Sequence, residues 1–112
     1  MGGRAGGGAG AVGEVTSPVV VDPEAQDEFD GGYDHYESNR VGLGEVFADA
    51  VQEVFDRVGR MPRLHRVVFA DIRRAIVRGF PYCVYYREEP TLIRVLSVFH
   101  TSRDPAIWQG RA

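Results

Sequence analysis

The segment LGEVFADAVQEVFDRVG (residues 43–59) decides the fold class, because it carries the strongest helical pattern in the chain. Its apolar residues recur every three or four positions, which is the spacing of one helix face; they are Leu43, Val46, Phe47, Ala50, Val51, Val54, Phe55 and Val58. Gly59 and the following Pro62 are typical of a helix end. The opposite face carries acidic residues and is expected to lie in solvent; these are Glu45, Asp49, Glu53 and Asp56.

The residues before this helix predict a short strand and a second helix. PVVV (18–21) is a β-branched run suited to an edge strand. In DPEA (22–25), Asp22 can cap a helix and Pro23 suits its first position. One helix face follows at spacings of four, four and three residues, with Ala25, Phe29, Tyr33 and Tyr36. Gly31-Gly32 weakens this helix by about 1 kcal/mol per glycine. NRVGLG (39–44) marks a break, so the two helices form a hairpin.

Three β-rich runs follow Pro62, namely ADIRRAIVR (70–78), YCVYY (82–86) and TLIRVLSVF (91–99). The last run is apolar at both odd and even positions, which predicts a central strand that is covered on both sides. The sequence therefore predicts an α+β fold with the order β-α-α-β-β-β, in which an antiparallel two-helix hairpin packs on a small, mainly antiparallel sheet. Residues 1–17 are glycine-rich and are expected to be a flexible tail, which leaves 18–112 as the single domain.

Composition limits the possible functions of the 112 residues. No apolar run approaches the roughly 18 residues that a membrane span needs, and the start lacks the apolar core of a secretion signal, so we expect a cytoplasmic protein. Cys83 is the only cysteine and is expected to be a small buried apolar residue. The three histidines, His35, His65 and His100, are scattered. Neither a metal site nor a cofactor site is therefore expected.

The net charge of −3 conceals a strong asymmetry between the two halves of the chain. Residues 1–56 contain 12 acidic and two basic side chains, whereas residues 57–112 contain four acidic and 11 basic ones. All basic residues are arginine, which forms a bidentate fork on carboxylates and phosphates. The basic half could face nucleic acid, an acidic protein segment, or the acidic half of the same molecule.

VFHTSRDP (98–105) contains the first candidate for chemistry. His100 at a strand end could act as a general acid or base, and Arg103 could hold a phosphate. Residues three apart on a strand point to opposite faces, so the two converge only if the chain turns at Thr101-Ser102. Otherwise His100 is a strand-end histidine bonded to a backbone carbonyl, and Arg103 pairs with Asp104 or an acidic helix.

The second candidate is the arginine group of the 70–78 run, with Arg73, Arg74 and Arg78. It could be a basic stripe for phosphates or an acidic peptide, or it could pair with the acidic helix faces. The nearby aromatic residues are expected to be core rather than a platform for stacking bases; they are Phe80, Tyr82, Tyr85, Tyr86 and Phe99.

Four segments together resemble the ParE branch of the RelE/ParE toxin superfamily, often labelled plasmid stabilisation proteins; they are DPEAQDEFDGGYDHYE, GLGEVFADAVQEV, IRRAIVRGFPYCVYYREE and IRVLSVFHTSRDPAIWQGR. The resemblance covers about residues 18–112 and is most specific in the last 40 residues. These proteins are toxins of bacterial type II toxin–antitoxin modules. Their fold of two antiparallel helices on a small sheet agrees with the order of elements predicted above. The glycine-rich tail and the Gly31-Gly32 pair depart from the family pattern.

The resemblance implies a toxin that is neutralised by a small ParD-like antitoxin in a hetero-oligomer. ParE-type members act on DNA gyrase, whereas RelE-type members cut mRNA in the ribosome and use an arginine in the strand before a Val-Tyr pair. This sequence has Tyr82 there and no arginine, although His100 lies near the end of the last strand, where nucleases often have a catalytic residue. The interpretation is therefore a non-catalytic gyrase inhibitor.

Two alternatives remain, a metal-independent mRNA endonuclease and a non-toxic member that only binds antitoxin and helps to regulate its operon. A nuclease would use His100, Arg103, Arg78 and Arg73. The candidate residues for contact with target or antitoxin are Arg73, Arg74, Arg78, His100, Arg103 and Trp108.

Overall fold

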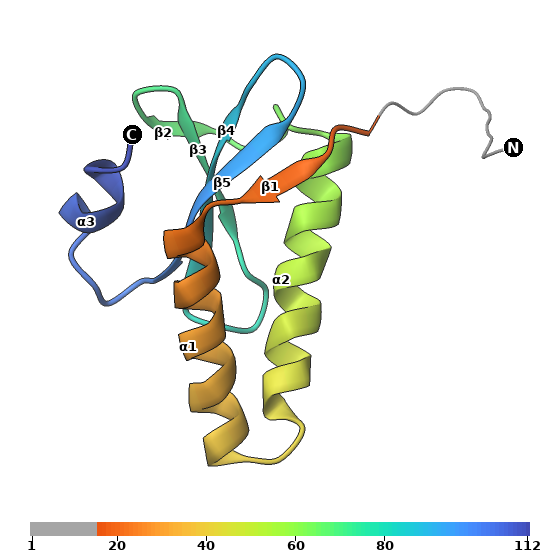
Figure 1. The fold of residues 1–112 in the computed structure, drawn as a ribbon, viewed down its shortest axis with the longest axis vertical. Coiled ribbons are helices and arrows are strands. Elements are labelled where there is room, and N and C mark those ends of the chain that lie inside the picture. Colours follow the sequence, from red (N-terminus) through yellow and green to blue (C-terminus); the bar gives the residue numbers. More distant parts are fainter. Residues whose placement is uncertain (1–15) are drawn as a thin grey trace, which may run out of the picture.

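The computed structural model describes residues 16–112, which form a mixed five-stranded sheet with an α-helical hairpin on one face (Figure 1). The elements are β1 (Val19–Val21), α1 (Pro23–Asn39), α2 (Leu43–Arg60), β2 (Val67–Phe69), β3 (Ile72–Ile76), β4 (Tyr82–Glu88), β5 (Ile93–His100) and α3 (Ala106–Gln109). The predicted tail of residues 1–17 lies outside the described residues except for its last two. Of these, Ser17 donates its amide to the carbonyl of Gly59.

The predicted helical hairpin is confirmed. Its connection turns at Gly42, whose φ of +92° favours glycine. The Glu37 carboxylate accepts hydrogen bonds from the amides of Gly42 and Gly44, which stabilises the start of α2. Asp22 occupies the predicted N-cap position of α1, but its side chain makes no capping hydrogen bond and instead pairs with Arg94 at 2.9 Å.

The predicted fold class is confirmed, but the predicted order of elements omits β2 and α3. The strand order is β1-β5-β4-β3-β2, in which β1 pairs parallel with β5 and all other pairs are antiparallel. β2 consists of only Val67, Val68 and Phe69, a run too short to show an alternating pattern in the sequence. The predicted 70–78 strand is shorter than expected, because Ala70 adopts a positive φ of 52° in a turn before β3.

A β-bulge in β5 explains why its apolar residues occupy both odd and even positions. Tyr85 pairs with Ser97 and Tyr86 with Val95, which leaves Leu96 as an extra residue. Val95 and Val98 consequently belong to the same core cluster beneath the helices, while Leu96 packs in the cluster on the other face. The predicted interior strand covered on both sides is confirmed, because β5 lies between β1 and β4 and its side chains belong to the apolar clusters on both faces of the sheet.

Two apolar clusters cover the two faces of the sheet. The larger one packs α1 and α2 against the sheet and contains Phe47, Val51, Val54, Val84 and Tyr86, each fully buried. The smaller cluster lies under α3 and contains Ile72, Cys83, Tyr85, Leu96, Phe99 and Trp108. The prediction that Cys83 is buried is confirmed, and so is the core position predicted for Tyr82, Tyr85, Tyr86 and Phe99. No helix within residues 16–112 is long and apolar enough to cross a bilayer.

Candidate functional site

His100 lies at the end of β5, where the chain turns back on itself. The Arg103 amide donates to the His100 carbonyl at 3.1 Å, so the turn required for the two side chains to meet is present. The Ser102 amide donates to His100 Nδ1 at 3.0 Å, and Ser102 Oγ lies 2.8 Å from the same nitrogen. Nδ1 is therefore an acceptor, and the neutral ring carries its proton on Nε2. The predicted bond from His100 to a backbone carbonyl is replaced by this contact with Ser102.

His100 and Arg103 line a notch beside α1 with a volume of about 350 Å³. The other lining residues are Asp27, Glu28, Gly31, Gly32, Tyr82 and Val98. The ring of Tyr82 packs edge-on against His100, with 5.1 Å between the ring centroids. Burial raises the pKa of Tyr82, with a smaller contribution from Tyr36, so its hydroxyl keeps its proton at neutral pH.

Arg103 is held by Glu28, as expected for pairing with an acidic helix. Its Nη1 lies 3.1 Å from Glu28 Oε2, and its guanidinium carbon lies 4.8 Å from the centroid of the Phe99 ring. The Glu28 side chain is only 10% exposed and accepts five hydrogen bonds in total. The donors are Ser97 Oγ, the Val98 amide, Arg103 and, twice, Arg111.

The sequence interpretation missed Glu28 and Arg111. The pairing between β1 and β5 ends at Val95, so beyond that residue the outer edge of β5 has no neighbouring strand. Glu28 accepts the Val98 amide at this edge, and Arg111 donates to the Leu96 carbonyl at 3.1 Å. The two side chains thus bond backbone groups that a further strand would otherwise pair. The signal for Glu28 was its place three residues after Ala25 on the inward-facing side of α1.

Trp108 anchors α3 to the outer face of the sheet. Its indole stacks on Tyr85, with 3.8 Å between the ring centroids and 15° between the planes. Phe69 packs edge-on against it at 5.9 Å. Trp108 is 3% exposed, and its indole N–H has no hydrogen-bond partner among the described residues. The structure therefore places it as a core residue and not as an exposed contact.

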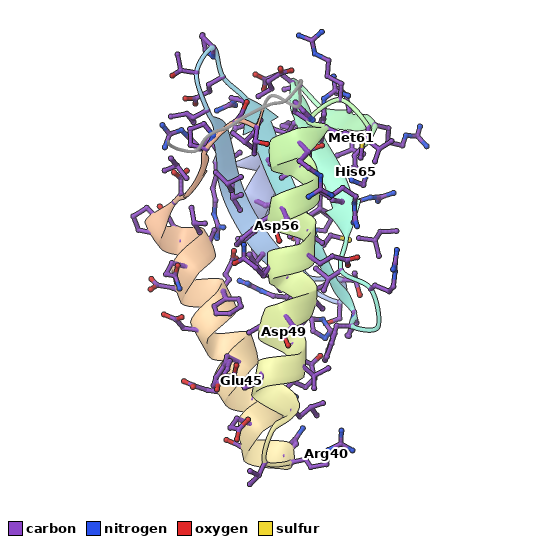
Figure 2. All side chains as sticks on the ribbon, turned by 90° about the vertical axis from the view of Figure 1, so that its right-hand side faces the viewer. Arg40, Glu45, Asp49, Asp56, Met61 and His65 are labelled. Atoms are coloured by element: carbon purple, nitrogen blue, oxygen red, sulfur yellow. The ribbon has the colours of Figure 1, made fainter. Side chains whose placement is uncertain are left out.

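The arginines of β3 lie in two environments. Arg73 donates from Nη1 to the His65 carbonyl at 2.6 Å and so supports the loop after α2. Arg74 and Arg78 line a second hollow of about 690 Å³, which we call the β3-edge groove. Its other lining residues are Arg57, Leu64, His65, Arg66 and Ile76. The side chains of Met61 and His65 mark this end of α2 in Figure 2.

Electrostatics within the β3-edge groove favour a neutral His65. Arg57 donates from Nε to His65 Nε2 at 3.4 Å, which requires that nitrogen to be unprotonated. Burial lowers the pKa of His65, and the nearby Arg57 charge lowers it further. Positive charge in the groove is therefore carried by arginine, and the exposed side chains of Leu64 and Ile76 lie beside these cations.

Many arginines of the basic half pair with acidic residues of the same chain. The pairs are Arg57–Glu53, Arg63–Glu88, Arg78–Glu53, Arg87–Asp71, Arg94–Asp22, Arg94–Glu89, Arg103–Glu28 and Arg111–Glu28. Arg66 and Arg74 make no ion pair within residues 16–112, and both line the β3-edge groove. The groove therefore holds two arginines, Arg66 and Arg74, without an ion pair among the described residues, beside Arg57 and Arg78, which share Glu53.

The structure brings together His100 with Arg103, and separately Arg74 with Arg78. It does not gather the four residues that a nuclease would need, because Arg78 lines the β3-edge groove and Arg73 is bound to a backbone carbonyl. The described residues contain no group of three His, Cys, Asp or Glu side chains that could hold a metal ion.

Comparisons with known proteins agree with this fold. No curated protein matches the sequence. A solved structure described as the chromosomal ParDE TA system from P. aeruginosa has a TM-score of 0.56 and 18% sequence identity, covering 76% of this chain and 96% of that chain. Residues 19–105 match the family described as the ParE toxin of the type II toxin–antitoxin system parDE. That match spans most of the chain, and the protein therefore belongs to the ParE toxin family.

Proposed function

We propose that this protein is the toxin of a bacterial toxin–antitoxin module, that it acts in the cytoplasm by binding and poisoning DNA gyrase, and that a cognate antitoxin neutralises it. The observation that carries the proposal is membership of the ParE toxin family over residues 19–105. A mode of action by binding, without bond cleavage, is supported by the way the candidate side chains are used in the fold.

Metal-independent RNA cleavage needs a proton shuttle and a cation on the same scissile phosphate. His100 and Arg103 share the notch beside α1, and this is the one arrangement that favours a nuclease. Arg103, however, already binds Glu28 through its Nη1 atom. Tyr82, whose ring packs against His100 in the notch, is only 9% exposed. Arg73 binds the His65 carbonyl, and Arg78 lines the separate β3-edge groove. The notch therefore has one arginine, already paired, to stabilise the charge that develops on a phosphate.

The candidate contact residues divide into two roles under this proposal. His100, Arg103 and Trp108 fix the chain after β5, through Ser102, Glu28 and Tyr85. Arg74 and Arg78 remain available to a partner, while Arg73 supports the loop behind them.

The decisive experiment measures gyrase and translation in parallel. Purified protein added to gyrase is expected to inhibit the supercoiling of relaxed plasmid, and to leave mRNA intact on purified ribosomes. Induction in cells is expected to trigger DNA damage signalling while translation initially continues. Site-specific mRNA cleavage on ribosomes, abolished by His100→Ala, would instead establish the nuclease. Growth that continues after induction of soluble protein would establish the non-toxic alternative.

A further inference from the structure

A hollow of about 690 Å³, which we call the hairpin hollow, lies between the two long helices and β1. Its apolar lining comes from all three elements, with Val19 and Val21 on β1, Phe29 on α1 and Phe55 on α2. These four side chains pack against the core beneath the helices, but each is only half-buried. The hollow therefore has an apolar floor that the described residues leave partly uncovered.

Exposed polar side chains form the rim of the hairpin hollow. Asp49, Gln52 and Asp56 are three and four residues apart and so lie along one side of α2, and Gln26 adds a second amide from α1. Figure 2 shows Asp49 and Asp56 along α2. Asp56 accepts a hydrogen bond from Gln52 at 3.0 Å. Neither carboxylate forms an ion pair in the part of the chain that the structure describes.

The surface around the hairpin hollow is also negative. Eight carboxylates of α1 and α2 make no ion pair within residues 16–112; they are Glu24, Asp27, Asp30, Asp34, Glu37, Glu45, Asp49 and Asp56. α2 separates this negative surface from the positive one, because Asp56 lines the hairpin hollow while Arg57 lines the β3-edge groove. The field of these carboxylates attracts cations toward the hollow.

We propose that the hairpin hollow binds a basic segment of the toxin's target, whose apolar side chains enter the hollow while its lysine or arginine side chains pair with Asp49 and Asp56. The proposal rests on the proposed function, since the partner is the protein that the toxin poisons. An enzyme that holds DNA exposes basic side chains to the phosphates, so a target of this kind offers such segments. Charge-assisted hydrogen bonds from a cation to a carboxylate are the stronger ones, and they would fix the segment over the apolar floor.

Other ligands match only part of the hairpin hollow. Nucleic acid would bring phosphates against unpaired carboxylates, which repel them. A polyamine would pair with the carboxylates but would leave Phe29 and Phe55 uncovered. A second copy of the chain, related by a two-fold axis, would place its own acidic rim against this one. A basic segment with apolar side chains matches the charge of the rim and the apolar floor together.

The test titrates isotope-labelled full-length protein and follows backbone amides by NMR. The main probe is a short end-blocked peptide of alternating Lys and Leu. Its controls are a Gln and Leu peptide, which lacks the charge, and a Lys and Ser peptide and spermine, which lack apolar side chains. We expect the Lys and Leu peptide to shift the amides of Val21, Asp49 and Asp56, and each control to bind at least about tenfold more weakly.

Three results of this titration would overturn the proposal. The first is that the Lys and Leu peptide leaves these amides unshifted. The second is that any control binds as tightly as the Lys and Leu peptide, since charge alone or apolar contact alone would then suffice. The third is that the same amides shift with protein concentration in the absence of any peptide, which would assign the hairpin hollow to a second copy of the chain.

Matched variants connect the hairpin hollow to inhibition. Asp49→Asn combined with Asp56→Asn is expected to weaken both the Lys and Leu peptide and the inhibition of gyrase by at least about tenfold, with a smaller effect at high salt. Glu24→Gln combined with Asp34→Asn makes the same change in charge at exposed positions outside the hollow, and should leave both unchanged. Equal losses in the two double variants would mean that net charge drives binding, and would refute the hollow. Thermal melts that match the unsubstituted protein establish that each variant is folded.

The proposed function and the hairpin hollow fail separately. Gyrase inhibition that survives unchanged in the Asp49→Asn, Asp56→Asn variant would refute the hollow and leave gyrase poisoning intact. Peptide-induced shifts at the hollow of a protein that leaves supercoiling unaffected would refute gyrase poisoning and leave the hollow as a site for a basic segment of another target.

Discussion

Replacing Glu28 with glutamine is expected to destabilise the fold strongly, because one carboxylate joins α1, β5 and the C-terminal segment. Glutamine keeps the size of the side chain but removes the charge that accepts bonds from Arg103 and Arg111. Breaking a buried ion pair on one side costs about 3–5 kcal/mol. Arg103 and Arg111 are 44% and 22% exposed and can recover hydration, so we expect a loss of about 2–3 kcal/mol. For a domain of this size that loss lowers the melting temperature by about 10–20 °C.

Urea unfolding followed by circular dichroism measures this loss directly. Asp27→Asn is the matched control, because Asp27 is exposed, adjacent on α1, and makes no ion pair among the described residues. A double-mutant cycle with Arg111→Met should show coupling of at least about 1 kcal/mol between positions 28 and 111. A free energy of unfolding for Glu28→Gln within about 0.5 kcal/mol of the unsubstituted protein would refute the role assigned to this carboxylate.

Two further predictions concern α1 and the loop after α2. Gly32→Ala should lower the free energy of unfolding by about 1–3 kcal/mol, because the added Cβ would lie 2.9 Å from the Phe47 ring. Gly31→Ala should instead raise the free energy of unfolding by up to about 1 kcal/mol, because its Cβ would meet open space and alanine favours a helix. Equal effects of the two substitutions in thermal melts would contradict this packing. The pKa of His65 is lowered in the fold by burial and Arg57, so the unfolded chain binds the proton more readily. The free energy of unfolding should therefore fall as the pH drops through about 6.5, the ordinary pKa of histidine. Urea titrations at pH values on either side of about 6.5 should show a weaker pH dependence for His65→Gln. An unchanged slope of the free energy of unfolding against pH in this variant would contradict the prediction.

The helices were predictable because their signal is local. In α2 the three-to-four spacing survives from Leu43 to Val58, and the buried residues of the helix follow it. β5 was predictable as a strand covered on both sides, but the alternation in its sequence could not reveal the bulge at Leu96. β2 escaped prediction because a three-residue strand with exposed ends has no periodic pattern to detect.

The candidate site was less predictable because its contacts are long-range. His100 and Arg103 lie in one motif, and the turn that joins them is local. Glu28 and Arg111 are 83 residues apart, and no local pattern links them. The division of the arginines between internal pairs and the β3-edge groove likewise depends on which acidic side chains the fold brings near. Charge asymmetry in the sequence left open whether the arginines face nucleic acid, an acidic protein segment or the acidic half of their own chain, and it assigned no single arginine to any of these.

The position of β5 between β1 and β4 has a consequence for synthesis of the chain. β1 and α1 are made before β5, the strand that pairs with β1, and before the arginine that binds Glu28, which lies 83 residues further along the chain. Chain growth at about 5–20 residues per second therefore leaves β1 without its partner strand until β5 has been made. A product truncated before β5 cannot form the pairing of β1 with Ile93, Arg94 and Val95.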